Sequence, residues 1–292
     1  MLSVPAPAKL NLALEVLAER GDGFHEISTV VQTISLCDRL DFKMSDDITF
    51  KCNESGWLFG KSLVSRAASL LQKSFDCSHG ATITVHKRIP LMSGLGGDSS
   101  DAAACLRGLN KLWGLSLSQE ELAPLASQLG SDVAFLLFGG TALLEGRGEV
   151  ISPLPSLPHM WVVLLIPPVP RPIGKTAQLY ASLETSHYTG GQITDDLVRL
   201  LSRGEGVTSA NLVNVFDNVA DDNFFGLNNY RKQFLKAGAG SVHLTGSGPA
   251  LFTLMKDKTQ AEKIYQHLQQ KGLKTYLVET LDVVDQVGLN SP

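Results

Sequence analysis

Apolar and polar residues alternate along several segments of the first part of the chain, and this pattern predicts extended strands. Residues 10–17 and 29–36 follow the two-residue period of a half-buried strand, and residues 47–52 show a similar pattern. Residues 81–85 form a run rich in β-branched side chains after Gly80 and predict a further strand. The beginning of the chain is therefore expected to be rich in sheet.

Apolar residues recur at the three- and four-residue spacing of amphipathic helices in the segments that follow. Residues 98–101, Asp-Ser-Ser-Asp, offer N-cap side chains to a helix that comes after a glycine loop at residues 93–97. Ser118 and Glu121 have the spacing of a capping box, and Gly139 stops the last of these helices. The predicted helices cover residues 61–73, 102–113, 118–129 and 132–137.

A proline-rich segment divides the chain into two predicted domains. Three prolines fall within residues 152–158, directly before an apolar strand at residues 161–166. We therefore expect one domain over residues 1–155 and a second over residues 156–292. The second half is predicted to contain helices at residues 175–184, 192–202 and 259–271, a strand-loop-strand unit at 241–255 and a strand at 274–279. This order of elements indicates an α+β fold.

The composition is that of an ordered globular protein. The 292 residues are 43% hydrophobic and 18% charged, which is enough apolar material for a sizeable core. The net charge is −4 and like charges do not cluster, so binding to nucleic acid or to an anionic membrane is disfavoured. The sequence shows neither a signal peptide nor an apolar run long enough to span a membrane, and we expect a cytoplasmic protein.

The cysteines and histidines are not spaced as metal ligands in the sequence. No pair of cysteines has the C-x-x-C spacing, and the seven histidines include no pair four residues apart. We expect buried, reduced thiols and no structural metal bound by the protein. The cysteines are Cys37, Cys52, Cys77 and Cys105.

The strongest local signal is a glycine-rich segment between a predicted strand and a predicted helix. Gly94 and Gly96 allow backbone N–H groups to approach an anion closely, and the N-terminus of the next helix adds its positive dipole. The alternative is an ordinary strand-to-helix turn with good capping. Asp98 would repel a phosphate unless it turns outward or meets a cation. Ser99 and Ser100 suit either capping or binding of a nucleotide-bound Mg²⁺.

Two other phosphate-binding patterns are dismissed. Residues 56–62 resemble a Walker A loop, but Gly56 and Gly60 are separated by three residues where that motif has four, and two of the three are aromatic. Bulky rings would crowd a loop that has to wrap a phosphate. The dinucleotide-binding fingerprint needs a third glycine where the chain has Ser99.

Four further features each have a structural explanation beside a functional one. Lys9 and Asn11 share one face of a predicted strand, where both could simply be solvated. Asp132 opens an otherwise apolar helix, either as a partner of the helix dipole or as a placed carboxylate. His25 lies in a turn between strands, as many surface histidines do, and residues 244–250 could form a plain hairpin despite their glycines.

The order of these signals resembles the GHMP small-molecule kinase superfamily. The segments that carry the resemblance run from residue 5 to about residue 252, and the first two are more specific than the glycine loop. They are Pro7-Ala-Lys-Leu-Asn-Leu, Asp22-Gly-Phe-His, residues 90–104, Gly130-Ser-Asp-Val, Gly146-Arg-Gly-Glu and Leu244-Thr-Gly-Ser-Gly-Pro. Within the superfamily, the motifs are most similar to kinases that phosphorylate a diphosphocytidyl alcohol in non-mevalonate isoprenoid biosynthesis.

The resemblance implies a fold, a co-substrate and an acceptor. The fold would have an N-terminal domain like the second domain of ribosomal protein S5 and a ferredoxin-like C-terminal domain. ATP with Mg²⁺ would meet, between the domains, a small-molecule substrate that carries a cytidine diphosphate group.

The resemblance also implies a role for each matching residue. Asp132 would take the proton of the acceptor hydroxyl, while Lys9 would neutralise charge near the acceptor oxygen and orient Asp132. Ser100 is the candidate ligand for the Mg²⁺ carried by ATP. The acceptor would be bound by Asn11, Phe24, His25 and Tyr180. The ATP phosphates would be held by Pro90, Leu91, Met92, Ser93, Gly94, Leu95, Gly96, Gly97, Asp98, Ser99 and Ser100.

Several positions depart from the pattern of the superfamily. Asp98 stands where many members have glycine, Phe24 where tyrosine is usual, and Ser62 where an asparagine is common near the adenosine pocket. Residues 214–217 match their family motif only in part. The cytosine ring is nevertheless expected between Phe24 and Tyr180, with a histidine at its polar edge.

Two alternatives stay open at this point. One is another GHMP kinase, acting for example on mevalonate or homoserine. The other is a catalytically silent member that binds a nucleotide and regulates or scaffolds. The presence of both Lys9 and Asp132 argues against a silent member.

Overall fold

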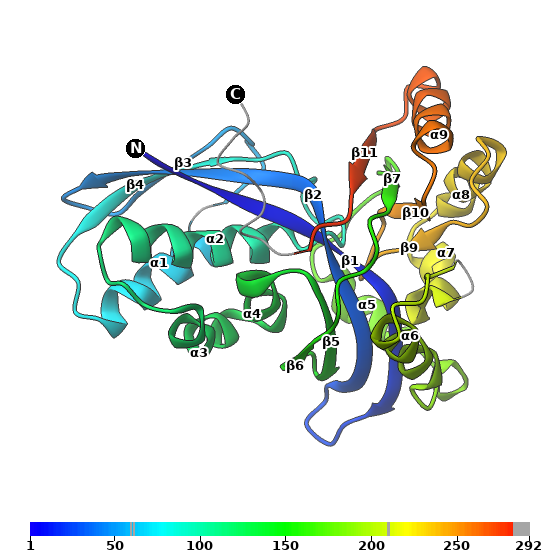
Figure 1. Cartoon of the computed structure of the whole chain (residues 1–292), viewed down its shortest axis with the longest axis horizontal. Coiled ribbons are helices and arrows are strands. Elements are labelled where there is room, and N and C mark those ends of the chain that lie inside the picture. The colour runs from blue at the N-terminus through cyan, green and yellow to red at the C-terminus, as the bar shows by residue number, and fades with distance from the viewer. Residues whose placement is uncertain (59, 61, 209–210, 283–292) are drawn as a thin grey trace.

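Two long antiparallel strands form the spine of the molecule. The computed structural model describes residues 1–58, 60, 62–208 and 211–282. Strand β1 (Leu2–Glu19) pairs along its whole length with β2 (His25–Ser45), and the two cross the molecule diagonally (Figure 1). Both are longer than the predicted segments 10–17 and 29–36, because residues on both faces of their central parts are buried and no solvent face interrupts the pairing.

Strand β2 is long enough to serve two further neighbours. Its Arg39–Ser45 end pairs with β4, and its Ile27–Gln32 part pairs with β5. Among the described residues this gives a seven-stranded sheet in the order β3-β4-β2-β1-β8, with β5 added beside β2 and β6 beside β5. The added strands are β3 (Thr49–Cys52), β4 (Gly80–His86), β5 (Thr141–Gly146), β6 (Val150–Pro153) and β8 (Val213–Asn214).

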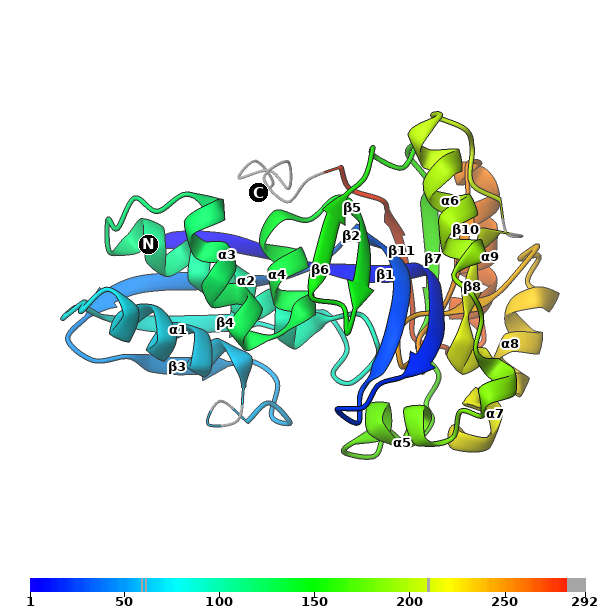
Figure 2. The same ribbon diagram turned by 90° about the horizontal axis from the view of Figure 1, so that it is seen from below.

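Four helices cover one face of this sheet, as Figures 1 and 2 show from two directions. They are α1 (Leu63–Ser74), α2 (Gly97–Leu112), α3 (Gln119–Leu129) and α4 (Ser131–Phe138). Their buried Ala and Leu residues pack with β2 and β4 in one core. The predicted capping box of α3 is confirmed, with both hydrogen bonds between Ser118 and Glu121 present.

The start of α2 differs from the expectation. The helix begins at Gly97, its N-cap residue is Gly96 in the left-handed conformation, and no side chain caps it. Residues 98–101 therefore lie inside the first turn, where their side chains are free for other contacts. The first predicted helix starts at Leu63, and Phe59 and Lys61 lie outside the described residues, so the Walker-like segment is described only in part.

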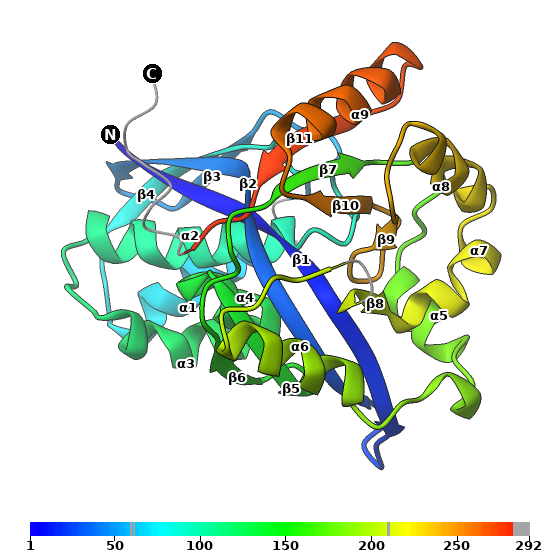
Figure 3. The same ribbon diagram turned by 45° about the vertical axis from the view of Figure 1, so that its right-hand side comes forward.

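The second sheet lies against the other face of the spine. Among the described residues it has four strands in the order β11-β7-β10-β9, all antiparallel, which with the intervening helices is the expected ferredoxin-like arrangement (Figure 3). Its strands are β7 (Trp161–Leu165), β9 (His243–Leu244), β10 (Leu251–Met255) and β11 (Thr275–Glu279). Leu10 and Leu12 of β1 pack in the core shared by the two sheets, so Lys9 and Asn11 face the opposite way, as predicted.

The remaining helices surround the second sheet. They are α5 (Lys175–Ala181), α6 (Gln192–Ser202), α7 (Ala220–Asn223), α8 (Leu227–Lys236) and α9 (Lys258–Gln270). Helix α6 contacts β1 and β2, and β8 pairs with β1 in parallel, so the second half of the chain contributes to both sheets. The boundary between residues 155 and 156 stays a prediction. The sequence pattern did not reveal β5, β6, β8 or α8.

The thiols are less uniformly buried than expected. No disulfide joins the four cysteines in the described part of the chain, but only Cys105 is buried and the other three are half-buried. Within the same residues, no group of three potential ligands lies close enough to hold a metal ion. Of the helices that the structure describes, none has the length and apolar character needed to cross a membrane.

Candidate active site

Two adjoining cavities lie where the glycine loop, the spine and the second half of the chain meet. The first has a volume of about 630 Å³ and follows residues 90–99; the second has a volume of about 410 Å³ and contains Lys9 and Asp132. Both volumes are typical of small-molecule sites. Five of the described residues line both cavities, so the two open into one another. These are Gly94, Gly96, Ser99, Thr176 and Ser247.

The glycine loop needs glycine at two positions. Gly94 has φ +89°, and a Cβ there would lie 2.3 Å from the carbonyl oxygen of Thr245. Gly96 has φ +71°, and a Cβ there would lie 2.9 Å from Cγ of Lys9. Both values are in the left-handed region, and both contacts are too short for a side chain. The loop therefore packs its backbone directly against the second glycine loop, residues 244–250, and against β1.

Most of the predicted phosphate-loop residues line the first cavity. The N-terminal turn of α2 is among them, so its unpaired N–H groups and positive dipole face the cavity. Leu95 is fully buried and lines neither cavity; its carbonyl accepts from the N–H of Lys9 at 3.0 Å. The lining members are Pro90, Leu91, Met92, Ser93, Gly94, Gly96, Gly97, Asp98 and Ser99.

The interpretation of Ser100 as a metal ligand needs correction. Its hydroxyl donates a 2.6 Å hydrogen bond to the carbonyl oxygen of Pro7, and the residue is buried. Ser100 thereby joins α2 to β1 and does not line either cavity. The hydroxyl that lies at the junction of the cavities belongs to Ser99.

Asp98 turns toward α1. Its Oδ2 accepts from the backbone N–H of Leu63 at 3.2 Å, at the first turn of α1. This contact explains how a carboxylate is tolerated in a loop suited to phosphate, because one of its oxygens already has a donor. Ser62 lies beside it as the N-cap of α1 and also lines the first cavity.

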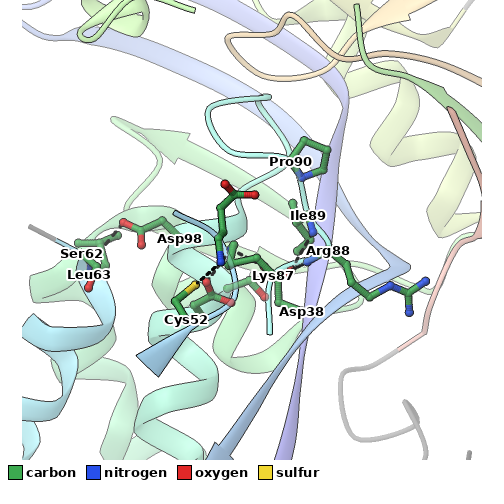
Figure 4. Close-up of polar contacts among 12 residues, drawn as sticks. Asp38, Cys52, Ser62, Leu63, Lys87, Arg88, Ile89, Pro90 and Asp98 are labelled. Atoms are coloured by element: carbon green, nitrogen blue, oxygen red, sulfur yellow. Dashed lines mark hydrogen bonds and ion pairs between the residues drawn. The ribbon is translucent and has the colours of Figure 1, made fainter. Parts of the chain in front are cut away.

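A buried ion-pair cluster holds the base of the loop (Figure 4). The ammonium of Lys87 contacts Asp38 of β2 and, at 2.6 Å, Asp101 of α2. Asp38 also accepts from the backbone N–H groups of Arg88 and Ile89, just before the loop. The segment that enters the loop and the helix that leaves it are therefore tied to the same lysine.

The second cavity contains the predicted pair of Lys9 and Asp132. Their nearest charged atoms, Nζ and Oδ2, are 3.6 Å apart. The side chain of Lys9 is 6% exposed and that of Asp132 is 38% exposed, so the carboxylate is the member that a small molecule can reach. Lys9 and Asn11 are buried, and the possibility that both are solvated is wrong.

A chain of hydrogen bonds fixes the position of Lys9. Its Nζ donates to Oδ1 of Asn11 at 2.6 Å, and Nδ2 of Asn11 donates to Thr29 at 2.9 Å. The N–H of Asn11 donates to Oγ1 of Thr245, from the second glycine loop. Thr29 was not singled out from the sequence, because a threonine in a strand carries no motif; Thr245 lies in the motif Leu244-Thr-Gly-Ser-Gly-Pro, which gave a signal for the segment but none for this side chain.

Aromatic side chains gather around Tyr180, which lines the second cavity, whereas the predicted acceptor residues Phe24 and His25 do not line it. His25 stacks on Tyr180 of α5 with ring centroids 4.7 Å apart, and its edge faces Tyr188. Phe24 is 54% exposed, and the guanidinium of Arg147 lies 4.8 Å from its ring centroid. Burial and the nearby charge of Asp132 raise the pKa of Tyr180 to about 12. The ring nitrogens of His25 make no hydrogen bond within the described residues.

The outer part of the first cavity is apolar. Leu58, Met92 and Ile173 line it although each is highly exposed, and the buried Trp57 lies beside them. Exposed apolar side chains that converge on one cavity indicate an apolar ligand group at this position. The sequence pattern had indicated that residues 56–62 do not wrap a phosphate, and the family resemblance had placed Ser62 near an adenosine pocket.

Besides Lys87, two basic residues that line the cavities were missed. Lys175 is the first residue of α5 and lines the first cavity, and Arg147 lines the second. Arg147 lies within a family motif, Gly146-Arg-Gly-Glu, which gave a signal for the segment but none for the side chain. Lys175 lies in no motif, and only the fold brings it to the glycine loop.

Two family models match the chain. The model described as GHMP kinases N terminal domain matches residues 62–140, and the model described as GHMP kinases C terminal matches residues 197–274. The first segment contains the glycine loop and Asp132. The second contains the loop at residues 244–250.

Curated relatives are similar to nearly the whole chain. A 4-diphosphocytidyl-2-C-methyl-D-erythritol kinase of Dehalococcoides mccartyi is 48% identical over 285 residues, which cover 98% of this chain and 100% of the relative. A protein of the same name from Geobacillus kaustophilus is 40% identical over 273 residues, which cover 92% and 93%.

Solved structures agree in fold. A crystal structure of a 4-(cytidine 5'-diphospho)-2C-methyl-D-erythritol kinase superposes with a TM-score of 0.81 at 30% identity, covering 96% of this chain and 99% of that chain. A homoserine kinase from Cytophaga hutchinsonii superposes with a TM-score of 0.67 at 21% identity, covering 96% and 95%. The second likeness concerns the fold alone.

Proposed function

The chain belongs to the GHMP kinase family of small-molecule kinases, and we propose that it transfers the γ-phosphoryl group of ATP to the 2-hydroxyl of 4-diphosphocytidyl-2-C-methyl-D-erythritol. The observation that carries this proposal is the pair of Lys9 and Asp132, which lies in the second cavity next to the glycine loop. The reaction belongs to isoprenoid precursor biosynthesis, and a cytoplasmic location stays a prediction.

The residues present suit the transfer step. Asp132 accepts the proton of the acceptor hydroxyl while the oxygen of that hydroxyl bonds to the γ-phosphorus. The bond from that phosphorus to the bridging oxygen breaks, and ADP leaves with the electron pair. The ammonium of Lys9 lies 3.6 Å from the carboxylate, where it stabilises the negative charge that develops on the acceptor oxygen.

The first cavity fits ATP. The phosphates would lie against the backbone of Gly94 and Gly96 and the N-terminus of α2, while adenine would lie between Leu58 and Ile173 at the apolar end. The Mg²⁺ that ATP carries would meet the hydroxyl of Ser99 and the carboxylate of Asp98, since this ion accepts oxygen ligands beside phosphate and water. When bound, Mg²⁺ neutralises phosphate charge during the transfer.

The second cavity fits an acceptor with a nucleobase and a diphosphate. Tyr180 lines this cavity, and His25, stacked on Tyr180, and Phe24, beside Arg147, add aromatic surface for a base; the ring nitrogens of His25, which make no hydrogen bond within the described residues, supply polar partners for the edge of the base. Arg147 supplies a cation for the diphosphate between the base and the reacting hydroxyl. Homoserine and mevalonate contain neither an aromatic ring nor a diphosphate, so this surface favours the cytidine compound over them.

The test offers the protein three acceptors separately: the diphosphocytidyl alcohol, mevalonate and homoserine. ADP release is measured together with the mass of the product. We expect turnover with the cytidine compound and an added mass of one phosphoryl group. Faster turnover of mevalonate or homoserine would overturn the assignment, and ATP binding without turnover of any acceptor would favour a silent member.

A further inference from the structure

Lys175 is a buried lysine that pairs with no carboxylate among the described residues. It is the first residue of α5, and only 8% of its surface is exposed. Its Nζ donates to the carbonyl oxygen of Ser247 at 2.9 Å and to the hydroxyl of Ser247 at 2.6 Å. An ammonium has three N–H groups, so one of them has no partner within the described residues.

The other lysines of the site differ from Lys175 in this respect. Lys87 contacts two carboxylates and Lys9 lies 3.6 Å from one. No carboxylate of the described part of the chain lies within ion-pair distance of Lys175. Burial of a charge without an opposite charge is costly, so an anion bound beside Lys175 would stabilise its ammonium.

The positive groups around Lys175 further destabilise its charged form and so favour a bound anion. Burial first, and then the positive charges of Lys9 and Arg171, lower the pKa of Lys175 to about 8. Asp98 and Lys87 also line the same cavity. Asp98 accepts from the backbone of α1, and Lys87 is neutralised by its own carboxylates. An anion that enters the cavity would therefore meet an excess of positive charge at Lys175.

The position of Lys175 shows where that anion would lie. Lys175 lines the first cavity together with Gly94, Gly96 and Ser99, and its partner Ser247 lines both cavities. The ammonium therefore lies near the junction of the two cavities, in the cavity that the glycine loop also lines.

We propose that Lys175 binds the β- and γ-phosphate oxygens of ATP. The C-terminal half of the chain thereby supplies the glycine loop with a second cation, in addition to Lys9 of β1. This inference rests on the proposed function for its ligand. A diphosphate of the acceptor has the same chemistry, but Lys175 lines the first cavity and not the second, whereas Arg147 lines the second. We therefore assign Lys175 to ATP.

Nucleotide binding tests the assignment without any acceptor. Dissociation constants of Mg·ATP and of AMP are measured by calorimetry for the full chain and for Lys175→Gln, which keeps an amide donor for Ser247 and loses the charge. We expect Lys175→Gln to weaken ATP binding about 10- to 100-fold and to change AMP binding less than about threefold, because AMP lacks the β- and γ-phosphates. Lys175→Arg should recover most of the loss. Lys236→Met, an exposed lysine of α8, is the matched control.

Proton uptake gives a readout that a merely structural role would not move. At pH 8 an ammonium with a pKa of about 8 is half protonated, and phosphate raises its pKa. ATP binding at this pH should therefore take up about half a proton, measured from the binding heat in buffers of different ionisation enthalpy. The uptake should be absent in Lys175→Gln and unchanged in Lys236→Met.

Three outcomes would overturn the inference. Equal losses of ATP and AMP binding, together with a lower melting temperature of Lys175→Gln, would show that Lys175 only holds Ser247. An unchanged ATP affinity with weaker binding of the cytidine acceptor would move Lys175 to the acceptor diphosphate. Proton uptake that persists in Lys175→Gln would belong to another group. If the cytidine compound is not a substrate, the proposed acceptor is wrong, and the ATP measurements still decide the role of Lys175.

Discussion

Asn11 holds Lys9 more closely than Asp132 does. The Nζ of Lys9 donates to Oδ1 of Asn11 at 2.6 Å, while the carboxylate of Asp132 is 3.6 Å away. A neutral amide thus fixes the direction of the ammonium without pairing its charge, which the proposed role of Lys9 toward the acceptor oxygen requires. The sequence predicted that Asn11 binds the acceptor. The structure adds a role that the sequence did not indicate, because Asn11 positions Lys9.

We expect Asp132→Asn to lower kcat about 10²- to 10⁴-fold, the usual contribution of a general base. The amide has nearly the same shape but cannot take the proton of the acceptor hydroxyl. Stopped reactions with ADP detection measure the rate, and calorimetry checks that the affinity for ATP is unchanged. A loss below about threefold would show that another group is the base.

Lys9→Ala and Asp132→Asn are expected to be strongly non-additive. If the ammonium and the carboxylate act as a unit, the double variant should be barely slower than either single variant. Asn11→Ala should lower kcat less than Lys9→Ala, because it loosens Lys9 without removing its charge. Multiplicative losses in the double variant would show that the two residues act independently.

Gly96→Ala should impair both ATP binding and catalysis. The added Cβ requires a φ of +71° and would lie 2.9 Å from Cγ of Lys9, so the loop and Lys9 cannot both keep their positions. We expect a higher KM for ATP together with a lower kcat, measured by steady-state kinetics. Gly114→Ala is the matched control, because Gly114 has a similar φ of +67° and a Cβ there meets nothing within 4 Å. Equal effects of the two substitutions would attribute the loss to backbone strain alone.

Lys87→Met should destabilise the fold by about 3–5 kcal/mol, because it leaves the buried Asp38 and Asp101 without a cation. Burial already raises the pKa of Asp101. A carboxyl whose pKa is raised in the folded state lowers the stability of the fold as the pH rises above the pKa that the carboxyl has in the unfolded chain. The difference from the unmodified chain should therefore be larger at pH 8 than at pH 5, as urea unfolding can measure. The exposed Lys236→Met should cost little at either pH.

The sequence predicted elements best where one local pattern decides the structure. The capping box of Ser118 and Glu121 and the two-residue period around Lys9 and Asn11 appear as expected. Strand β5 was missed, because its pairing with β2 depends on residues more than a hundred positions away, and β6, which pairs with β5, was missed with it. Three prolines near β6 had instead indicated a linker.

The site was predictable to the same extent. The glycine loop, Lys9 and Asp132 lie in recognisable segments, and the structure brings them together around two cavities. Ser100 could be either a cap or a ligand from its spacing, and only the contact with Pro7 decides between these roles. Lys175 and Thr245 belong to segments distant from the loop, so their part in the site depends on tertiary packing.

The aromatic group around Tyr180 should decide whether the acceptor is a cytidine compound. Tyr180→Ala removes one stacking surface, which contributes roughly 1–3 kcal/mol for a stacked base, so we expect the acceptor KM to rise at least about tenfold with the ATP KM nearly unchanged. Phe24→Tyr is the matched control: Phe24 is 54% exposed, the added hydroxyl can reach water, and the ring is kept.

His25→Ala should affect selectivity as well as affinity. Its ring covers one face of Tyr180 in this structure, so a base that stacks on that face must displace His25 toward the edge of the base. Pairing of His25 with the amino and ring-nitrogen atoms of cytosine would leave buried polar groups unpaired with uracil, which is the stronger kind of rejection. We expect His25→Ala to raise the acceptor KM and to reduce the preference for cytidine over the uridine analogue in competition assays. Equal phosphorylation of the two compounds by the unmodified chain would show that this group of rings does not read the base.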